Sequence, residues 1–198
     1  MQSVDWNGYW LSAWTIAGIL ACLAVYAGLA QGWQNGLVLG GFAAALIIYL
    51  GIQRDAPAVF NAVMNASVAM NAGGWAWQIF DGIWGYDEVA HALGTLGMTL
   101  MIGWYGYRPI ASALRRHGWV MLLAVLALGI ALGAWWEIAE WIGYWFFAQP
   151  SVQVLDDKIS DLVADSIGAL IAAAFFRWAL VERVDGAAGN AWHAAPNG

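Results

Sequence analysis

The chain has 198 residues, of which 62% are hydrophobic and only 10% are charged. A soluble domain carries about 25% charged residues, so this composition excludes an ordinary soluble surface and indicates a protein dissolved in lipid. The net charge of −6 argues against nucleic acid as a partner, because nucleic-acid binding needs a basic surface.

Six segments are apolar and long enough to cross a bilayer, which takes about 20 helical residues. In chain order they are residues 10–30, 36–53, 58–80, 86–105, 119–147 and 158–180. The third is the most polar, since Asn61, Asn65, Ser67 and Asn71 interrupt it. We therefore expect an all-α, polytopic bundle of about six transmembrane helices, forming one domain over residues 1–184. Residues 185–198 are expected to be a flexible tail, because Gly, Ala, Asn and Pro are frequent there.

The basic residues predict how these spans are oriented. With six spans, one side of the membrane carries six arginines: Arg54, Arg108, Arg115, Arg116, Arg177 and Arg183. The other side carries Lys158. Because positively charged loops stay on the cytoplasmic side, both termini are expected in the cytoplasm.

The acidic residues are concentrated in the second half of the chain. Nine of the 13 are Asp81, Asp87, Glu88, Glu137, Glu140, Asp156, Asp157, Asp161 and Asp165. They fall at the start of the fourth span, the end of the fifth and the start of the sixth. In the orientation above, all nine are expected at or within the outer leaflet of the bilayer.

Helical spacing places these acids on one stripe of each helix. In the fourth span, Asp87 and Glu88 lie four and three residues before His91. The other stripes are Glu137, Glu140 and Tyr144 in the fifth span, and Asp157, Asp161 and Asp165 in the sixth. A charge facing lipid costs on the order of several kcal/mol, so the stripes are expected to face one another or a water-filled cavity.

So many carboxylates in one place need positive charge or protons, because like charges and burial both disfavour ionisation. His91 and Lys158 are the basic groups expected nearby, and two cannot balance nine acids. One imidazole with several carboxylates suits a divalent metal such as Mn, Fe, Zn or Mg. The candidate ligands are Glu88, His91, Glu137, Glu140, Asp161 and Asp165. Three further residues are expected to support these ligands: Asp87, which would orient His91, together with Asp157 and Tyr144.

Three interpretations of this cluster stay open. A metal site would serve lipid or cell-envelope chemistry, with a lipid or envelope molecule as the substrate. Intramembrane Asp, Glu and His chains also mark proton and ion routes, which would make the protein a proton- or ion-linked transporter. Carboxyl groups can instead join helices, in a non-enzymatic subunit of a larger membrane complex or a homo-oligomer. The residues do not decide whether the protein is an enzyme.

The order of these motifs resembles a known family. Tyr-Asp-x-x-x-His opens one span, Glu-x-x-Glu lies near the end of the next, and Asp-x-x-x-Asp opens the last, followed by Gly168. This pattern resembles the uncharacterised bacterial inner-membrane family typified by YjdF, and it is more distantly similar to the VanZ-like proteins linked to teicoplanin resistance. The resemblance covers roughly residues 75–172.

The resemblance implies a multi-pass protein of the bacterial cytoplasmic (inner) membrane. It singles out Asp87, His91, Glu137, Glu140, Asp157, Asp161 and Gly168. The chain departs from the family pattern at Glu88 and Val89, where a basic residue and a small or aliphatic residue are expected. It departs again at Asp165, where the pattern is usually apolar. Both changes make the cluster more acidic, which favours a cation site over a simple structural salt bridge.

Overall fold

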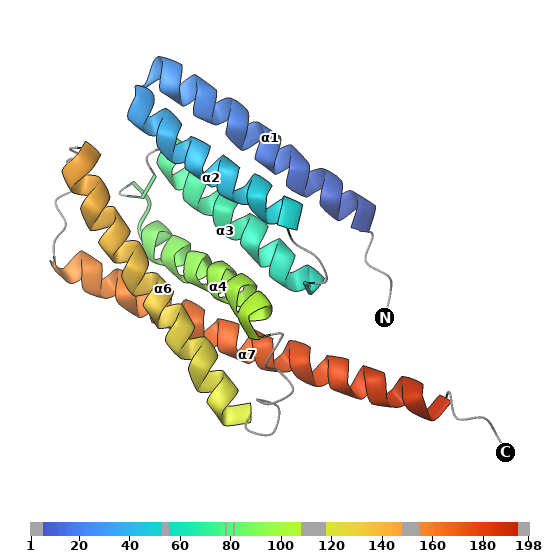
Figure 1. Ribbon diagram of the computed structural model, residues 1–198. Coiled ribbons are helices and arrows are strands. Elements are labelled where there is room, and N and C mark those ends of the chain that lie inside the picture. The colour runs from blue at the N-terminus through green and yellow to red at the C-terminus, as the bar shows by residue number, and fades with distance from the viewer. Residues whose placement is uncertain are drawn as a thin grey trace.

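The structure, a computed structural model, describes residues 6–52, 56–77, 79–80, 82–107, 118–147 and 155–193. Over these residues the chain is all-helical, with six helices and no strand (Figure 1). The helices are α1 (Trp6–Ala30), α2 (Trp33–Ile52), α3 (Ala58–Trp77), α4 (Tyr86–Tyr107), α6 (Gly118–Phe147) and α7 (Leu155–His193). Each apolar segment found in the sequence falls on one of them, so the all-α prediction is confirmed.

Among the described helices, α1, α2, α6 and α7 are long and apolar enough to cross a membrane. The qualifying stretches are Ala13–Ala30, Trp33–Gly51, Gly118–Gly143 and Asp157–Trp178. Helices α3 and α4 have 20 and 22 residues, a length of about 30 Å, but they are more polar. Their polar side chains are buried inside the bundle: Asn61, Asn65, Ser67, His91, Thr95 and Thr99. A count of six crossings therefore stays a prediction.

Helix α4 lies at the centre of the bundle (Figure 1). It packs against α3 on one side and against α6 and α7 on the other. The pairs α1–α2 and α2–α3 complete the N-terminal group of helices. Consecutive helices run in opposite directions, and the first turn of α1 and the last turn of α7 lie at the same end of the bundle.

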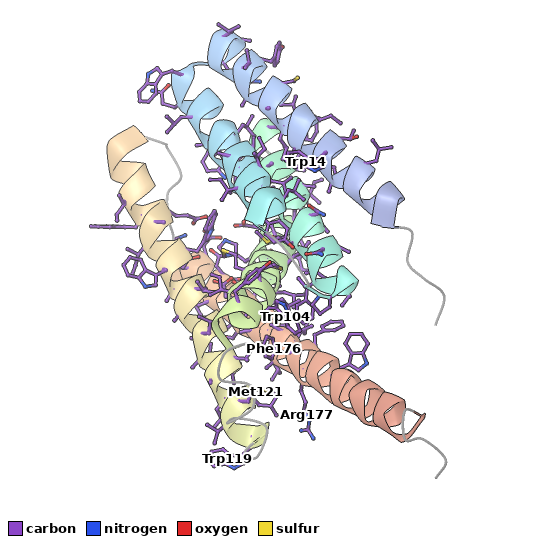
Figure 2. All side chains as sticks on the ribbon, turned by 45° about the vertical axis from the view of Figure 1, so that its right-hand side comes forward. Trp14, Trp104, Trp119, Met121, Phe176 and Arg177 are labelled. Carbon is purple, nitrogen blue, oxygen red and sulfur yellow. The ribbon has the colours of Figure 1, made fainter. Side chains whose placement is uncertain are left out.

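An aromatic cluster joins three helices near the end of α4. The ring centroids of Phe60, Trp104 and Phe176 lie 5.8 to 6.2 Å apart. All three side chains are buried. Figure 2 shows Trp104 and Phe176 together where α4 meets α7, with Trp119 and Arg177 toward the lower end of the same view. This apolar packing holds α7 against α4 on the side of the bundle away from the acids.

The outer faces of the helices expose large apolar side chains. Leu11, Val25, Leu29, Ile48, Leu123 and Leu170 are each more than half exposed. In water such a surface would be costly, whereas in a bilayer it contacts lipid tails. The exposed apolar faces and the four long apolar helices both indicate a membrane protein.

Helix α7 continues to His193, so helical backbone covers most of the segment expected to be a tail. Ala187, Ala188 and Ala191 lie in this stretch, and alanine is the strongest helix former. Residues 194–198 lie outside the described part of the chain, and the domain boundary at residue 184 stays a prediction. The predicted orientation of the spans in the membrane depends largely on four arginines outside the described residues: Arg54, Arg108, Arg115 and Arg116. The side chain of Arg183 is not described either.

Gly168 allows α7 to approach α4 closely. A Cβ atom added at Gly168 would collide with the carbonyl oxygen of Ala92. On α6, a Cβ added at Gly129 would lie 2.9 Å from the Cα of Ala169 on α7. Small residues of this kind let membrane helices pack backbone to backbone. The acids of α6 and α7 are thereby brought beside α4.

We predict that Gly168→Ala destabilises the protein, because the added methyl group has no space against the Ala92 carbonyl. The expected loss is about 1–3 kcal/mol, as for other overpacked positions. The matched control is Gly18→Ala on α1, where a new Cβ meets nothing within 4 Å. Thermal unfolding of both variants in mild detergent measures the difference, and equal midpoints would contradict the close α4–α7 approach.

Candidate functional site

His91 lies on α4 a little more than one turn after the helix begins, and it is only 6% exposed. Its ring is surrounded by carboxylates at no more than 3.9 Å. The Nε2 atom is 3.7 Å from Asp87 Oδ1 and 3.9 Å from both Glu140 Oε1 and Asp161 Oδ1. The Nδ1 atom is 3.5 Å from Glu137 Oε1 and from Asp165 Oδ1. One buried imidazole therefore has acids at both of its nitrogen atoms.

Three helices supply these acids. Asp87 comes from α4, Glu137 and Glu140 from α6, and Asp161 and Asp165 from α7. Each pair on α6 and α7 is spaced by three or four residues, so both members project from the same helix face. The structure thus places the stripes found in the sequence face to face, around His91.

Lys158 neutralises part of this charge. Its Nζ atom lies 2.6 Å from Glu137 Oε2 and 2.7 Å from Glu140 Oε2. A longer contact of 3.8 Å reaches Asp161 Oδ2. The lysine side chain is 20% exposed, so it lies at the edge of the cluster, whereas His91 lies inside it. The ammonium group bridges the two glutamates of α6 from the first turn of α7.

Neighbouring side chains orient two of the carboxylates. Thr95 Oγ1 donates a hydrogen bond of 2.6 Å to Asp165 Oδ1, and Trp136 Nε1 donates one of 2.9 Å to Glu140 Oε1. A Cβ atom at Gly133 would lie 2.5 Å from Asp165 Oδ2, so only glycine leaves room for this carboxylate between α6 and α7.

Some buried polar atoms of the cluster have no hydrogen-bond partner among the described residues. They are His91 Nδ1, Glu137 Oε1 and Asp165 Oδ2. Buried polar groups in proteins are nearly always satisfied, by protein, water or a bound ion. These three atoms belong to three helices but to one cluster. They are therefore free to make further hydrogen bonds, to water, to a bound ion or, after a small movement, to one another.

Two overlapping groups in the described chain have a geometry suited to a metal ion. One consists of Asp87, His91 and Asp161, and the other of His91, Glu137 and Glu140. In each group the candidate ligand atoms all lie within 4.8 Å of one another. Carboxylates and imidazole suit divalent transition metals, and carboxylates also suit Mg. His91 belongs to both groups, so one nitrogen or the other would be the ligand.

The structure gives Asp87 and Glu88 different surroundings from those expected. Asp87, expected to support His91, lies in one of the metal-suited groups. Glu88, expected to be a ligand, accepts a hydrogen bond of 3.1 Å from Ser160 Oγ. One residue along a helix turns the side chain by about 100°, which separates these neighbours. The spacing to His91 alone does not distinguish Asp87 from Glu88, because residues three and four positions before His91 both lie on its side of the helix.

The remaining predicted residues have different positions. Asp165 contacts His91 but belongs to neither metal-suited group. Asp157 is exposed. Asp81 and the side chains of Tyr144 and Asp156 lie outside the described residues.

Thr95, Trp136 and Ser160 contact the acids but were not singled out in the sequence. Thr95 lies four residues after His91, and Trp136 four before Glu140, so helical spacing from those residues was the available signal. Ser160 precedes Asp161 directly, and its contact with Glu88 depends on how α7 packs against α4.

Together, the fold and this cluster define an all-helical integral membrane protein with a buried histidine surrounded by carboxylates. The chain matches the family model described as "Predicted membrane protein (DUF2238)" over residues 9–182. Because the match covers most of the sequence, the chain belongs to this family. No curated protein and no solved structure matches it. All the residues of the cluster lie within the matched range.

We predict strong coupling between Lys158 and Glu137. Lys158→Met leaves Glu137 without its positive partner, and Glu137→Gln removes one of the two glutamates that contact the Lys158 ammonium group, so each should destabilise the protein. The double variant should lose less than the sum of the two, by about 0.5–3 kcal/mol. Unfolding equilibria of the four proteins in mixed detergent micelles give the coupling energy. Simple additivity would show that this ion pair does not contribute to stability.

Proposed function

We propose that the cluster around His91 binds a divalent cation, Mn, Fe, Zn or Mg, and that the bound ion serves lipid or cell-envelope chemistry. The observation that supports this most strongly is the set of five carboxylates, from three helices, within 3.9 Å of one buried imidazole. Such an arrangement is costly to build unless something positive occupies it.

The charge balance gives the physical argument. Six acids of the cluster are Asp87, Glu88, Glu137, Glu140, Asp161 and Asp165. Within the described part of the chain, the positive groups that contact them are Lys158 and, when protonated, His91. Two like unit charges 4 Å apart repel each other by about 4 kcal/mol at the effective dielectric constant near a protein surface. A divalent ion would replace repulsion among the carboxylates with attraction.

The two nitrogens of His91 suggest where the ion binds. Metal-ligating histidines usually bind through one nitrogen and donate a hydrogen bond from the other to a carboxylate or carbonyl. Nδ1 lies 3.5 Å from Glu137 Oε1 and from Asp165 Oδ1, so a small movement would let either carboxylate accept that hydrogen bond. Nε2 faces Asp87 and Asp161, together with Glu140. We therefore assign Nε2, Asp87 and Asp161 as the principal ligands.

The position of Lys158 favours the same assignment. Its ammonium group already contacts Glu137 and Glu140 at 2.6 and 2.7 Å, so these glutamates have a positive partner. Asp87 has no lysine or arginine partner among the described residues. An ion beside Asp87 would supply the missing charge, with Glu140 able to complete its coordination.

A proton- or ion-linked transporter is the second candidate. Buried hydroxyl groups continue along α4 beyond His91, at Thr95 and Thr99. Thr99 lies eight residues past His91, a depth of about 12 Å along the helix. Buried Ser67 and Asn65 on α3 add polar groups inside the bundle. Such a series of polar residues suits proton or ion movement toward the opposite side.

The membrane setting belongs to the same proposal. We place the protein in the bacterial cytoplasmic (inner) membrane as a YjdF-like protein, distantly similar to VanZ-like proteins. Six crossings with both termini in the cytoplasm would put His91 in the outer leaflet. The alternating helix directions and the 30 Å length of α3 and α4 support six crossings.

We predict near-stoichiometric divalent metal in protein purified in mild detergent, measured by inductively coupled plasma mass spectrometry. His91→Ala and Asp161→Asn should each lower the metal content at least tenfold, because both remove an assigned ligand. The matched control is Asp157→Asn, an exposed acid one turn from Asp161, which should keep its metal. Unfolding midpoints verify that each variant is folded.

The metal proposal fails if the folded wild-type protein contains no metal after reconstitution with Mn, Fe, Zn and Mg in turn. Proton-dependent uptake in proteoliposomes would then favour the transporter. Equal metal in wild type and in both ligand variants would place any ion elsewhere.

We predict that the end of the bundle carrying the acids faces outward. In a Cys22→Ala background, Trp84→Cys should react with a membrane-impermeant maleimide on intact cells, because Trp84 is 99% exposed beside the start of α4. Gly118→Cys, at the opposite end, should react only after the cells are permeabilised. The reverse pattern would invert the orientation and put the cluster in the inner leaflet.

A further inference from the structure

A cavity of about 350 Å³ lies directly beside His91. Its walls come mostly from α2, α3 and α4, and they are largely apolar: Val38, Phe42, Ala45, Met64, Val68 and Met98 contribute. Ligand pockets for small molecules have volumes of about 300–1,000 Å³ and a similar mixture of apolar walls and few polar groups. The cavity therefore has the size and lining of a binding site for part of an apolar molecule.

The charged groups of the cavity belong to the cluster around His91, and Ser67 and Asn71 of α3 add uncharged polar groups. His91 and Asp165 both line it, together with Thr95. His91 is 6% exposed and Asp165 2%, and His91 Nδ1 and Asp165 Oδ2 have no hydrogen-bond partner among the described residues. An occupant of the cavity would thus have an apolar part against α2 and α3 and a polar part at His91.

The position of α2 indicates where such a molecule enters. Gly41 and Ala45 line the cavity and are also exposed at the protein surface. Both lie in the middle of the apolar stretch Trp33–Gly51, where the surroundings are the hydrocarbon of the bilayer. The cavity therefore opens sideways into lipid.

Helices α2 and α6 flank this opening without close packing between them. Each packs instead on its own neighbours, α2 on α1 and α3, and α6 on α4 and α7. The rings of Phe42 and Trp136 span the interval, with centroids 6.4 Å apart. Trp136 also donates its hydrogen bond to Glu140, so the same side chain borders both the cavity and the acids.

We infer that the cavity holds an acyl chain of a membrane phospholipid, which enters between α2 and α6 and brings its phosphate past His91, which lines the cavity, to the ion on the Nε2 side of the imidazole ring. The inference rests on the proposed cation site. Carboxylates alone would repel a phosphate, whereas Mg and similar ions commonly bridge one or two carboxylates and a substrate phosphate. The occupant is thus an amphiphile with a phosphate head group.

The test uses a phosphatidylglycerol carrying a photoreactive diazirine in its acyl chain, with purified, metal-loaded protein in detergent micelles. Cross-links at Met64 and Met98, inside the cavity, are compared with those at Leu170 on the outer surface of α7. Gly41→Leu adds a bulky side chain at a residue that lines the cavity, where a new Cβ meets nothing within 4 Å. Gly18→Leu, equally open but on α1, is the matched control.

We expect Gly41→Leu to lower labelling of Met64 and Met98 at least fivefold, while Gly18→Leu leaves it unchanged. Metal content and the unfolding midpoint of Gly41→Leu should equal those of the wild type. Chelation by EDTA, or His91→Ala, should lower labelling of the cavity as well. A diacylglycerol probe with the same chains but no phosphate should label the cavity several-fold less.

The outcomes separate this inference from the function on which it rests. Undiminished cavity labelling in Gly41→Leu overturns the lipid site, even if metal is bound. The role of the ion is overturned if neither EDTA nor His91→Ala changes the labelling of the cavity. The role of the phosphate is overturned if the diacylglycerol probe labels the cavity equally. Absence of metal from the wild-type protein overturns the cation site itself, whatever the lipid probe shows.

Discussion

Negative charge held inside a membrane bundle is the constraint on which the rest of this structure depends. Carboxylates from α4, α6 and α7 surround His91, and Lys158 contacts them only from the edge. Charges in a bilayer are tolerated where they face one another or water, because exposure to lipid costs several kcal/mol or more. The polar helix α4 therefore occupies the centre of the bundle, and the apolar helices shield it. The same constraint favours the cation that we propose at this cluster.

Close helix packing makes this arrangement possible. Gly168 and Gly129 let the backbones of α4, α6 and α7 approach, and Gly133 leaves room for the Asp165 carboxylate. At the other end, Phe60, Trp104 and Phe176 join α3, α4 and α7 through apolar contact. The N-terminal helices pack less directly on the cluster, and the cavity beside His91 lies between the two groups. The charged cluster thus borders the cavity.

Sequence pattern predicted the helices well, because apolar length is a strong signal for spans and Pro57 and Gly32 lie in short connections. It also predicted the convergence on His91, since charges on three neighbouring spans are expected to face inward. It did not distinguish Asp87 from Glu88, because both precede His91 by about one turn of α4, and only the packing of α7 on α4 decides that Glu88 meets Ser160. The cavity was not predicted at all, since it depends on how α2, α3 and α4 pack together beside α6, which no local motif specifies.

The central claim is that His91 Nε2 and neighbouring carboxylates bind a divalent ion, and pulsed electron paramagnetic resonance of Mn(II)-loaded protein tests it most directly. Coupling to an imidazole ¹⁴N nucleus should appear in the wild type and vanish in folded His91→Gln, because no other histidine lies among the assigned ligands. A bound Mn(II) signal with no nitrogen coupling, or coupling that persists in His91→Gln, would contradict this account.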